Sequence, residues 1–296
     1  MAGKGRPSIG FVGLGLMGSA FTRRLVERGH RVIGFDVVKD KIEAAVRHNV
    51  DAASSAADVA RRADVVLMCV TSTHAVEEAV FGHDGIAAGG SSDKILVDHS
   101  TSEIAATRDM AAKLETECGM PWVDAPVSGG PGAAAAGTLA IMAGGEEAAI
   151  ARIAPVMADL SAAFTHLGPV GAGQATKMVN QVLVLNTYCV LAEALGLAER
   201  CGVDASKIPQ ALAPGHAGSN MLKNVFPRMI ARDFAPRGFA RQVLKDLDML
   251  HDVSKEMKAP LPMSAQANTL FRLLVARGHG ELDATAVLKL YLDEPV

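Results

Sequence analysis

The sequence predicts an α/β protein in which a Rossmann-type doubly wound sheet is followed by an all-helical second domain. From residue 8 to about residue 167, short β-branched runs alternate with amphipathic, alanine-rich stretches, the pattern of βα units in a parallel sheet. Beyond this point the chain keeps helical periodicity and almost loses the alternation typical of strands. A glycine-rich segment at 168–173 separates the two patterns. We therefore expect one domain over residues 1–168 and a second over residues 169–296.

The expected strands of the first domain are short and rich in β-branched residues. They cover residues 9–12, 31–36, 64–70, 94–98, 122–124 and 139–143. The expected helices between them cover residues 17–28, 39–48, 73–81 and 102–118. Gly29 follows the first helix, where a left-handed cap is favoured. We interpret Ser100, Thr101 and Ser102 as the N-cap of the helix at 102–118.

The second domain is expected to begin with one long helix over residues 172–201. Its length would be about 45 Å at 1.5 Å per residue, enough to cross the face of the first domain beside an interdomain cleft. Further helices are expected over residues 239–257, 261–277 and 284–292.

Composition excludes several classes of protein. A net charge of −3, with 21% charged residues, lacks the positive excess of a nucleic-acid-binding surface. The four cysteines show neither a CxxC pair nor metal-ligand spacing, which favours a reducing, cytoplasmic compartment and no metal site. The most apolar segment, 182–197, is interrupted by Asn186 and Glu193, so we expect a soluble protein with no membrane span. Lys4 and Arg6 precede an apolar run and imitate a secretory signal, but the glycine spacing within that run argues against one.

A GxGxxG motif follows the first strand and opens the first helix. It consists of Gly13, Leu14, Gly15, Leu16, Met17 and Gly18. In this setting the first glycine permits a tight turn, the second lets the backbone approach a pyrophosphate, and the third allows close packing of helix and strand. The amides at the helix end would face the anion. The motif predicts dinucleotide binding, and the alternative is a merely glycine-rich turn.

Asp36 ends the second expected strand, where an acidic side chain accepts hydrogen bonds from the ribose hydroxyls of NAD. A 2′-phosphate would be repelled there, and Val37 and Val38 supply no guanidinium for it. NAD is therefore the expected cofactor. NADP stays possible because Arg23, Arg24 or Lys39 could reach a 2′-phosphate.

Two further segments have the residue types of a substrate site. Residues 124–131 form a turn of glycines flanked by prolines, whose amides and hydroxyl could converge on a carboxylate or could serve structure alone. Lys177, Asn180 and Gln181 stand at i, i+3 and i+4, on one face of the long helix. A lysine enclosed in a cleft can have its pKa lowered toward acid/base use, although spacing alone favours an ordinary solvated lysine.

Taken together, the motifs resemble the beta-hydroxyacid dehydrogenase family, which includes 3-hydroxyisobutyrate dehydrogenase and tartronate semialdehyde reductase. The likeness covers almost the whole chain. Four blocks in the family's order carry it: Ile9-Gly-Phe-Val-Gly-Leu-Gly-Leu-Met-Gly18, Asp124-Ala-Pro-Val-Ser-Gly-Gly130, Gly171-Ala-Gly-Gln-Ala-Thr-Lys177-Met-Val-Asn180 and Lys245-Asp246-Leu247.

The resemblance implies a role for each matching residue. Lys177 would be the catalytic lysine and Asn180 would position the reacting oxygen. The substrate carboxylate would be held by Ser128, Gly129 and Gly130. Asp246 would steady Lys177 beside the substrate, and Lys245 would touch cofactor or substrate. The remaining cofactor contacts would be Val70 and Thr71 on the adenosine side and Thr101 beside the nicotinamide. Ordinary surface charge is the alternative reading of Lys245 and Asp246.

The sequence departs from the family at Gln181, where many members have a second asparagine next to Asn180. This places a longer amide close to the substrate, so the substrate is in question and the reaction is not. Ser219, Asn220 and Phe239 are further candidates for the specificity pocket.

The expected activity is hydride transfer between NAD and a small 3-hydroxy acid or carboxylate semialdehyde, such as 3-hydroxyisobutyrate or glycerate and tartronate semialdehyde. Three alternatives remain. Imine reductases generally lack the lysine and prefer NADP, and phosphogluconate dehydrogenases are longer and carry a histidine pair where this chain has Met178 and Val179. A third is a non-enzymatic cofactor-binding module. Apolar faces on second-domain helices, and the resemblance, predict a homodimer or homotetramer.

Overall fold

The chain divides into two units inside a single long helix, α8 (Ala172–Arg200). The computed structural model describes residues 6–292. One unit comprises Met1–Lys177 and the other Met178–Val296. The expected domain boundary after residue 168 lies shortly before this helix and stays a prediction.

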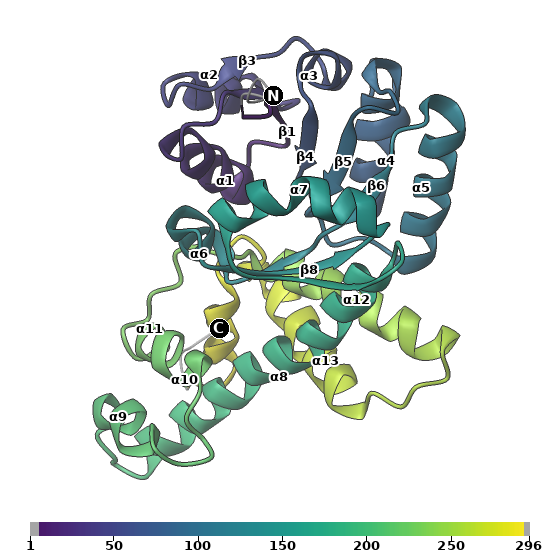
Figure 1. Ribbon diagram of the computed structural model, residues 1–296. Helices are drawn as coiled ribbons and strands as arrows, with labels where there is room; N and C mark the ends of the chain where they lie inside the picture. Colours follow the sequence, from purple (N-terminus) through teal and green to yellow (C-terminus); the bar gives the residue numbers. More distant parts are fainter. Residues whose placement is uncertain (1–5, 293–296) are drawn as a thin grey trace. The chain divides into compact units, whose positions relative to one another are not determined.

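A mixed sheet forms the centre of the first unit (Figure 1). Its strands are β1 (Ile9–Val12), β2 (Val32–Phe35), β3 (Asp51–Ala52), β4 (Val65–Met68), β5 (Ile95–Asp98), β6 (Trp122–Asp124), β7 (Val127–Ser128), β8 (Leu139–Gly144) and β9 (Ser161–Gly168). Their order is β3-β2-β1-β4-β5-β6-β8-β7, with β9 paired to β8. The first six strands in this order are parallel. The chain adds strands on one side of β1 up to β3 and then on the other side from β4 onward, which confirms the predicted doubly wound arrangement.

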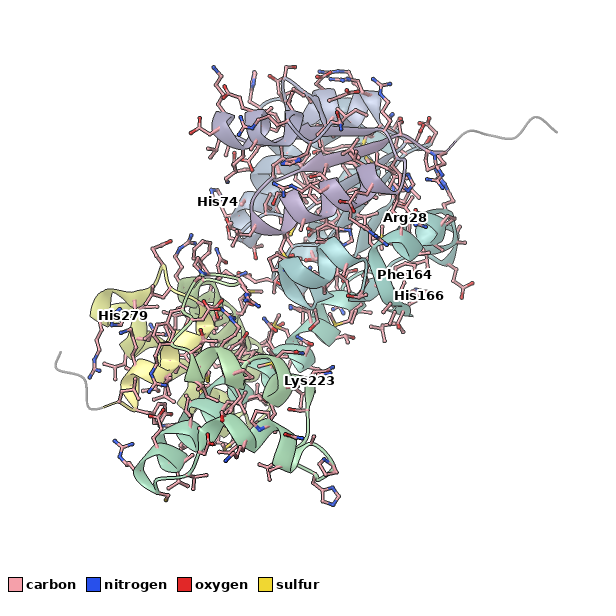
Figure 2. The ribbon with its side chains drawn as sticks, turned by 90° about the vertical axis from the view of Figure 1, so that its left-hand side faces the viewer. Arg28, His74, Phe164, His166, Lys223 and His279 are labelled. Atoms are coloured by element: carbon pink, nitrogen blue, oxygen red, sulfur yellow. The ribbon has the colours of Figure 1, made fainter. Side chains whose placement is uncertain are left out.

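The sequence pattern predicts a parallel sheet, but the sheet is not parallel throughout. β8 runs antiparallel to both β6 and β7. Only residues 129–138 separate β7 from β8, and a parallel crossover requires a dozen or more. β9 returns parallel to β8 after the helix α7 (Glu147–Leu160). The sequence did not predict β9 because its exposed and half-buried positions do not alternate with period two. Figure 2 shows Phe164 and His166 on this strand.

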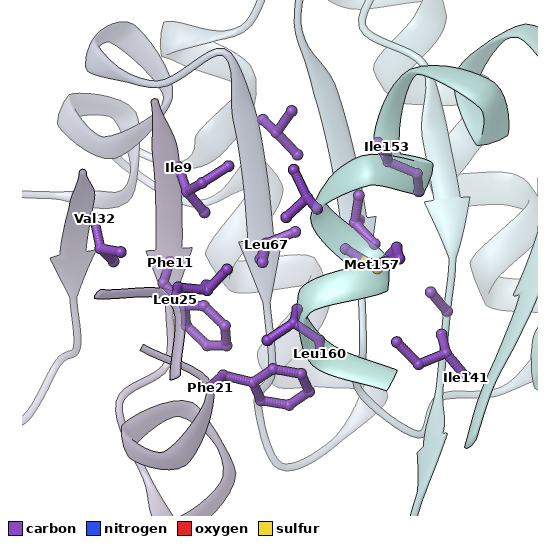
Figure 3. Close-up of a cluster of buried hydrophobic side chains, with 14 of the residues drawn as sticks. Ile9, Phe11, Phe21, Leu25, Val32, Leu67, Ile141, Ile153, Met157 and Leu160 are labelled. Carbon is purple, nitrogen blue, oxygen red and sulfur yellow. The ribbon is translucent and has the colours of Figure 1, made fainter. Parts of the chain in front are cut away.

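Helices cover both faces of the sheet. One face packs against α1 (Leu16–Glu27), α2 (Lys39–Val46), α6 (Gly130–Ala136) and α7. The other packs against α3 (Ala56–Arg62), α4 (Thr73–Phe81), the 3-10 turn Ile86–Gly89 and α5 (Ile104–Cys118). In Figure 3, Phe11 and Leu67 from the strands meet Phe21 of α1 and Met157 of α7. Burial of this apolar surface holds the strand ends in place, at about 25 cal/mol per Å².

The described part of the second unit is helical. Besides the rest of α8, its elements are a 3-10 turn at Ala205–Lys207, α9 (Ile208–Leu212), α10 (Asn220–Asn224), α11 (Phe226–Ile230), α12 (Ala240–Glu256), α13 (Pro262–Leu274), a π turn at Val275–His279 and a 3-10 helix at Ala284–Leu290. Between residues 178 and 292 the backbone pairs in β fashion only at the isolated bridge between Phe239 and Asp283. These elements confirm the expected all-helical character, with 3-10 geometry in the last one.

Arg228 of α11 joins the buried carboxylate of Asp283 to the partly exposed carboxylate of Asp233 in the second unit. It donates to Asp233 and Asp283, each at 3.0 Å, and its side chain is only 10% exposed. Asp283 also accepts from the backbone amides of Arg237 and Gly238. This network fixes the loop that leads into α12, the helix that carries Lys245.

Helix α8 is the one helix in the described residues that is long and apolar enough, by length and composition alone, to cross a membrane. Of its most apolar window, 44% is buried in the protein. Core helices of soluble proteins meet the same criterion.

Candidate active site

The phosphate loop joins β1 to α1 and has the geometry expected of its three glycines. Gly13 has a φ of +93°, and a Cβ there would lie 2.4 Å from the Cys69 carbonyl oxygen. A Cβ on Gly18 would lie 1.8 Å from the Gly13 carbonyl oxygen. Gly15 has no atom within 4 Å of a Cβ position. The loop is therefore closed where helix and strand pack, and open where a ligand backbone would approach.

The first turn of α1 is suited to an anion. Gly15 is the N-cap and provides no side-chain acceptor, and the first turn contains no acidic residue. The amides of Leu16, Met17 and Gly18 lie in this turn, whose N–H groups lack intrahelical partners. A pyrophosphate would satisfy these donors and be favoured by the helix dipole. The residues present therefore fit a dinucleotide.

Asp36 lies directly after β2, beside the phosphate loop. Its carboxylate accepts hydrogen bonds from the amides of Leu14, at 2.7 Å, and Val38, at 2.8 Å. Lys41 forms an ion pair with it at 3.4 Å. These contacts fix a carboxylate at the end of β2, where it also strengthens the turn.

The ends of β4 and β5 are joined by a hydrogen bond from the Val70 amide to Ser100 Oγ, at 2.9 Å. This bond brings the segment containing Val70 and Thr71 next to the segment containing Thr101. The expected N-cap at residues 100–102 is wrong. Helix α5 begins at Ile104. Its N-cap is Glu103, whose side chain accepts no capping hydrogen bond from the helix. The Ser100 hydroxyl instead accepts from the Val70 amide, and the Ser102 hydroxyl is bonded to the Thr107 hydroxyl and to the Gln174 side chain of α8.

Lys177 lies beside the turn that follows β6. Its side chain is buried, with 8% of the residue exposed, and Nζ donates to the Val127 carbonyl oxygen at 2.8 Å. Val127 is followed in the turn by Ser128, Gly129 and Gly130. The two glycines have φ of +126° and +68°, and α6 begins at Gly130. The structure thus brings the expected acid/base lysine to the expected carboxylate turn.

Two polar residues of this region were not assigned a role from the sequence. Asp124 ends β6 and accepts hydrogen bonds from the amides of Gly171 and Gln174, each at 2.8 Å. Burial raises the pKa of Asp124 to about 7, although the two amide donors act in the opposite direction. Gln174 is fully buried, and its amide group binds Ser100 and Ser102. A strand-ending aspartate and a glutamine in a first helical turn were the available signals.

In the second unit, four expected site residues form one chain of contacts. Asn180 donates to the Gln181 side-chain oxygen at 2.9 Å, and Gln181 donates to Asp246. The other oxygen of Asp246 lies 3.0 Å from Lys245 Nζ. Gln181 and Asp246 are both buried, at 6% and 9% exposure. The longer amide at Gln181 is therefore used to hold Asp246, while the expected contact of Asp246 with Lys177 stays a prediction.

No group of three or more His, Cys, Asp or Glu side chains between residues 6 and 292 is arranged to hold a metal ion.

Comparison with known families gives two matches that together cover nearly the whole chain. Residues 8–168 match the NAD binding domain of 6-phosphogluconate dehydrogenase. Residues 171–291 match the family described as NAD-binding of NADP-dependent 3-hydroxyisobutyrate dehydrogenase. The chain belongs to the beta-hydroxyacid dehydrogenase family.

Relatives in the beta-hydroxyacid dehydrogenase family match over almost their full length. The 2-hydroxy-3-oxopropionate reductase of Escherichia coli (strain K12) is 34% identical, over 95% of this chain and 96% of its own. The 2-(hydroxymethyl)glutarate dehydrogenase of Eubacterium barkeri is also 34% identical, over 96% of this chain and 94% of its own. A structure of 3-hydroxyisobutyrate dehydrogenase from Mycobacterium tuberculosis with L-serine is 31% identical, with a TM-score of 0.83 and coverage of 96% and 98%.

As a member of the beta-hydroxyacid dehydrogenase family, the chain is an NAD(P)-dependent oxidoreductase that acts on CH–OH groups.

Proposed function

We propose that this enzyme interconverts a small 3-hydroxy acid and its semialdehyde with NAD, and that Lys177 is the general acid/base. The observation that carries the proposal is the hydrogen bond from Lys177 to Val127. The buried amine thus lies next to Ser128 and the glycines that follow, which supports a site in which Lys177 would donate the proton and this turn would hold the carboxylate. A substrate fixed by its carboxylate would present its C3 oxygen to Lys177.

The chain's own residues account for the proton and for orientation. When bound, the nicotinamide supplies or accepts the hydride. In reduction, protonated Lys177 gives a proton to the carbonyl oxygen as the hydride adds to carbon, and the product is an alcohol. In oxidation, neutral Lys177 takes the hydroxyl proton as the hydride leaves. Asn180 would hold the reacting oxygen, and Ser128, Gly129 and Gly130 would hold the carboxylate.

NAD is the proposed cofactor because of Asp36. A carboxylate at the end of β2 attracts ribose hydroxyls and repels a 2′-phosphate. Val37 is 90% exposed and supplies no positive charge to offset this repulsion. Lys41 is already paired with Asp36. If NADP binds, the Lys41 ammonium is the group that would offset the repulsion between Asp36 and the 2′-phosphate.

A short acid with a primary alcohol or aldehyde is the proposed substrate class. The relatives include a 2-hydroxy-3-oxopropionate reductase, a 2-(hydroxymethyl)glutarate dehydrogenase and a 3-hydroxyisobutyrate dehydrogenase whose structure was solved with L-serine. All three compounds join a carboxylate to such a group. Gln181 would border the variable substituent, with Ser219, Asn220 and Phe239 as further candidates.

We also propose a cytosolic location and a homo-oligomeric state. None of the four cysteines, all of which lie between residues 6 and 292, forms a disulfide, as expected in a reducing compartment. A second copy of the chain is the partner favoured by exposed apolar residues on α8.

The test is a steady-state screen of 3-hydroxyisobutyrate, glycerate, serine, threonate and sulfolactate with NAD and NADP. We expect turnover with at least one of them and a higher kcat/KM with NAD. Lys177→Ala should lower kcat about 10²–10⁴-fold, the usual contribution of general acid/base catalysis, and should still bind NAD.

Two variants control for this experiment. Lys177→Met keeps the aliphatic stem and should lose as much activity, which separates loss of the amine from loss of packing. Lys113→Ala removes an exposed lysine of α5 and should be fully active. Near-normal turnover of Lys177→Ala would refute the acid/base role. NADP preference with reduction of imines would favour an imine reductase, and NAD binding without any turnover would favour a non-catalytic module.

A further inference from the structure

The first turns of α8 are capped by a residue from the sheet. Asp124 lies at the end of β6 with no exposed surface, and its two oxygens accept from the amides of Gly171 and Gln174, each at 2.8 Å. Both amides belong to the helix start, where N–H groups have no intrahelical acceptor. Asp124 thus does from the sheet what an N-cap side chain does locally, because its two oxygens supply the acceptors that these amides lack within the helix.

Gln174 attaches the same helical turn to the end of β5. Its side-chain NH₂ donates to the Ser100 carbonyl oxygen at 2.8 Å and to Ser102 Oγ at 3.1 Å. Its side-chain oxygen accepts from the Ser102 amide at 3.2 Å. Gln174 is fully buried, so these bonds are shielded from water. Thr101, the residue expected beside the nicotinamide, lies between the two serines.

Close packing prevents the helix start from shifting relative to the sheet. A Cβ on Gly173 would lie 2.5 Å from the carbonyl oxygens of both Asp124 and Met142. The helix backbone therefore touches two strands directly at the turn that Asp124 and Gln174 hold. Lys177 follows Gln174 by three residues and reaches Val127 on the carboxylate turn.

We propose that Asp124 and Gln174 are positioning residues, which set Lys177 between the end of β5 and the carboxylate turn by anchoring the first turns of α8. The inference rests on the proposed function in taking Lys177 as the acid/base. An α-helix transmits a displacement of its first turn to a side chain one turn later. A misplacement of about 1 Å at a reacting group can cost about 10²-fold in rate, so the anchors act on kcat through Lys177.

The kinetic test uses Asp124→Asn and Gln174→Met, each close in size to the original side chain. Both should lower kcat about 10- to 100-fold and change the Kd of NAD by less than about twofold, because the phosphate loop is untouched. In the Lys177→Ala background each should cost less than about threefold, since the group they position is gone. Ser55→Ala, which removes the N-cap of α3 in the same unit, should lower Tm and leave kcat unchanged.

A second readout does not depend on turnover. Acetylation of Lys177 by acetic anhydride, followed by mass spectrometry, should be at least about threefold faster in Asp124→Asn and Gln174→Met than in the wild type, and unchanged in Ser55→Ala. Amide exchange in the segment 171–177 should rise in the same two variants.

The outcomes separate the two proposals. If the wild type turns over no substrate but labelling and exchange change as expected, the proposed function fails and the anchoring stands. Unchanged labelling and exchange, or losses of kcat that are as large in the Lys177→Ala background, would overturn the anchoring whatever the activity. If Asp124→Asn does not fold, Gln174→Met alone decides by the same criteria.

Discussion

His99 is a histidine enclosed by the first unit just after β5. It is 2% exposed, its ring stacks on Phe21 with centroids 4.9 Å apart, and Nδ1–H donates to the Ala125 carbonyl oxygen at 2.7 Å. Burial lowers the pKa of His99 from 6.5 to about 4, although the hydrogen bond to Ala125 opposes the shift. The side chain therefore supports the turn after β6 as a neutral ring.

Because the folded pKa of His99 lies below the unfolded value, protons bind the unfolded chain preferentially between pH 6.5 and about 4. The stability due to neutral His99 is present above pH 6.5 and is lost as the pH falls. From pH 6.5 to 5 this corresponds to a loss of about 2 kcal/mol in the free energy of unfolding. His99→Asn keeps a hydrogen-bond donor for Ala125 but has no group that titrates there. Between pH 6.5 and 5 its free energy of unfolding should therefore fall by about 2 kcal/mol less than that of the wild type, as measured by urea unfolding at each pH.

The exposed His83→Asn variant is the control and should follow the wild type. Asp124 titrates in the opposite sense over an overlapping range, because its raised pKa favours protonation of the folded state. It is common to all three proteins, so its contribution cancels in the difference. Parallel pH profiles of wild type and His99→Asn would contradict the prediction.

Residues whose local geometry depends on near neighbours could be predicted from the sequence. Gly13 and Gly18 are constrained by the turn they belong to, and Asp36 by its place at the end of a strand. Asp124 and Gln174 could not be assigned in this way. Their partners lie 47 to 74 residues away, and only the folded sheet brings them together.

At the scale of elements, the loop before α12 depends on Arg228. Replacing it by Met would leave Asp283, 2% exposed at its side chain, without its cation. Removing one partner of a buried ion pair costs about 3 kcal/mol or more, so Arg228→Met should lower the free energy of unfolding by about that amount in denaturant titrations. Arg241→Met removes the exposed pair with Glu281 and should cost less than about 1 kcal/mol. Equal effects of the two substitutions would show that the buried network is not what holds this loop.

The strands that precede the phosphate loop and the expected carboxylate turn were predictable, whereas β7 and β9 were not. β1 and β6 match the expected ranges because each is a buried apolar run. β7 has two residues and β9 is largely exposed, so neither has a pattern that distinguishes it from a loop. Their strand geometry follows from pairing with β8, which is a tertiary effect.

At the scale of the whole molecule, α8 carries an apolar stripe, which consists of Val179, Leu183, Val190 and Leu197. Their spacings of four, seven and seven residues place them on one helical face, and each is more than half exposed. An exposed row of large apolar side chains is unfavourable in water, and a second chain would cover it. The double variant Leu183→Glu, Val190→Glu should therefore have a smaller mass than the wild type in light scattering after gel filtration.

Leu212→Glu, a similar change at a 43% exposed leucine of α9, is the control and should keep the wild-type mass. If the wild type is monomeric, or if the double variant keeps the wild-type mass, the stripe is not the subunit contact. The all-helical character of the second unit was predictable because its helical periodicity is continuous. Which helix faces are buried depends on the elements or chains that pack against them, and a single sequence does not specify these.

The division of the chain inside α8 limits how this enzyme can be recombined with its relatives. A chimaera joined at the glycine-rich segment 168–173 would take Asp124 from one parent and Gln174 from the other, and the buried carboxylate would then rely on foreign amides. A graft joined after Lys177 would keep the sheet, both anchors and the lysine from one parent. The transferable module is therefore the sheet together with the first turns of the helix that follows it.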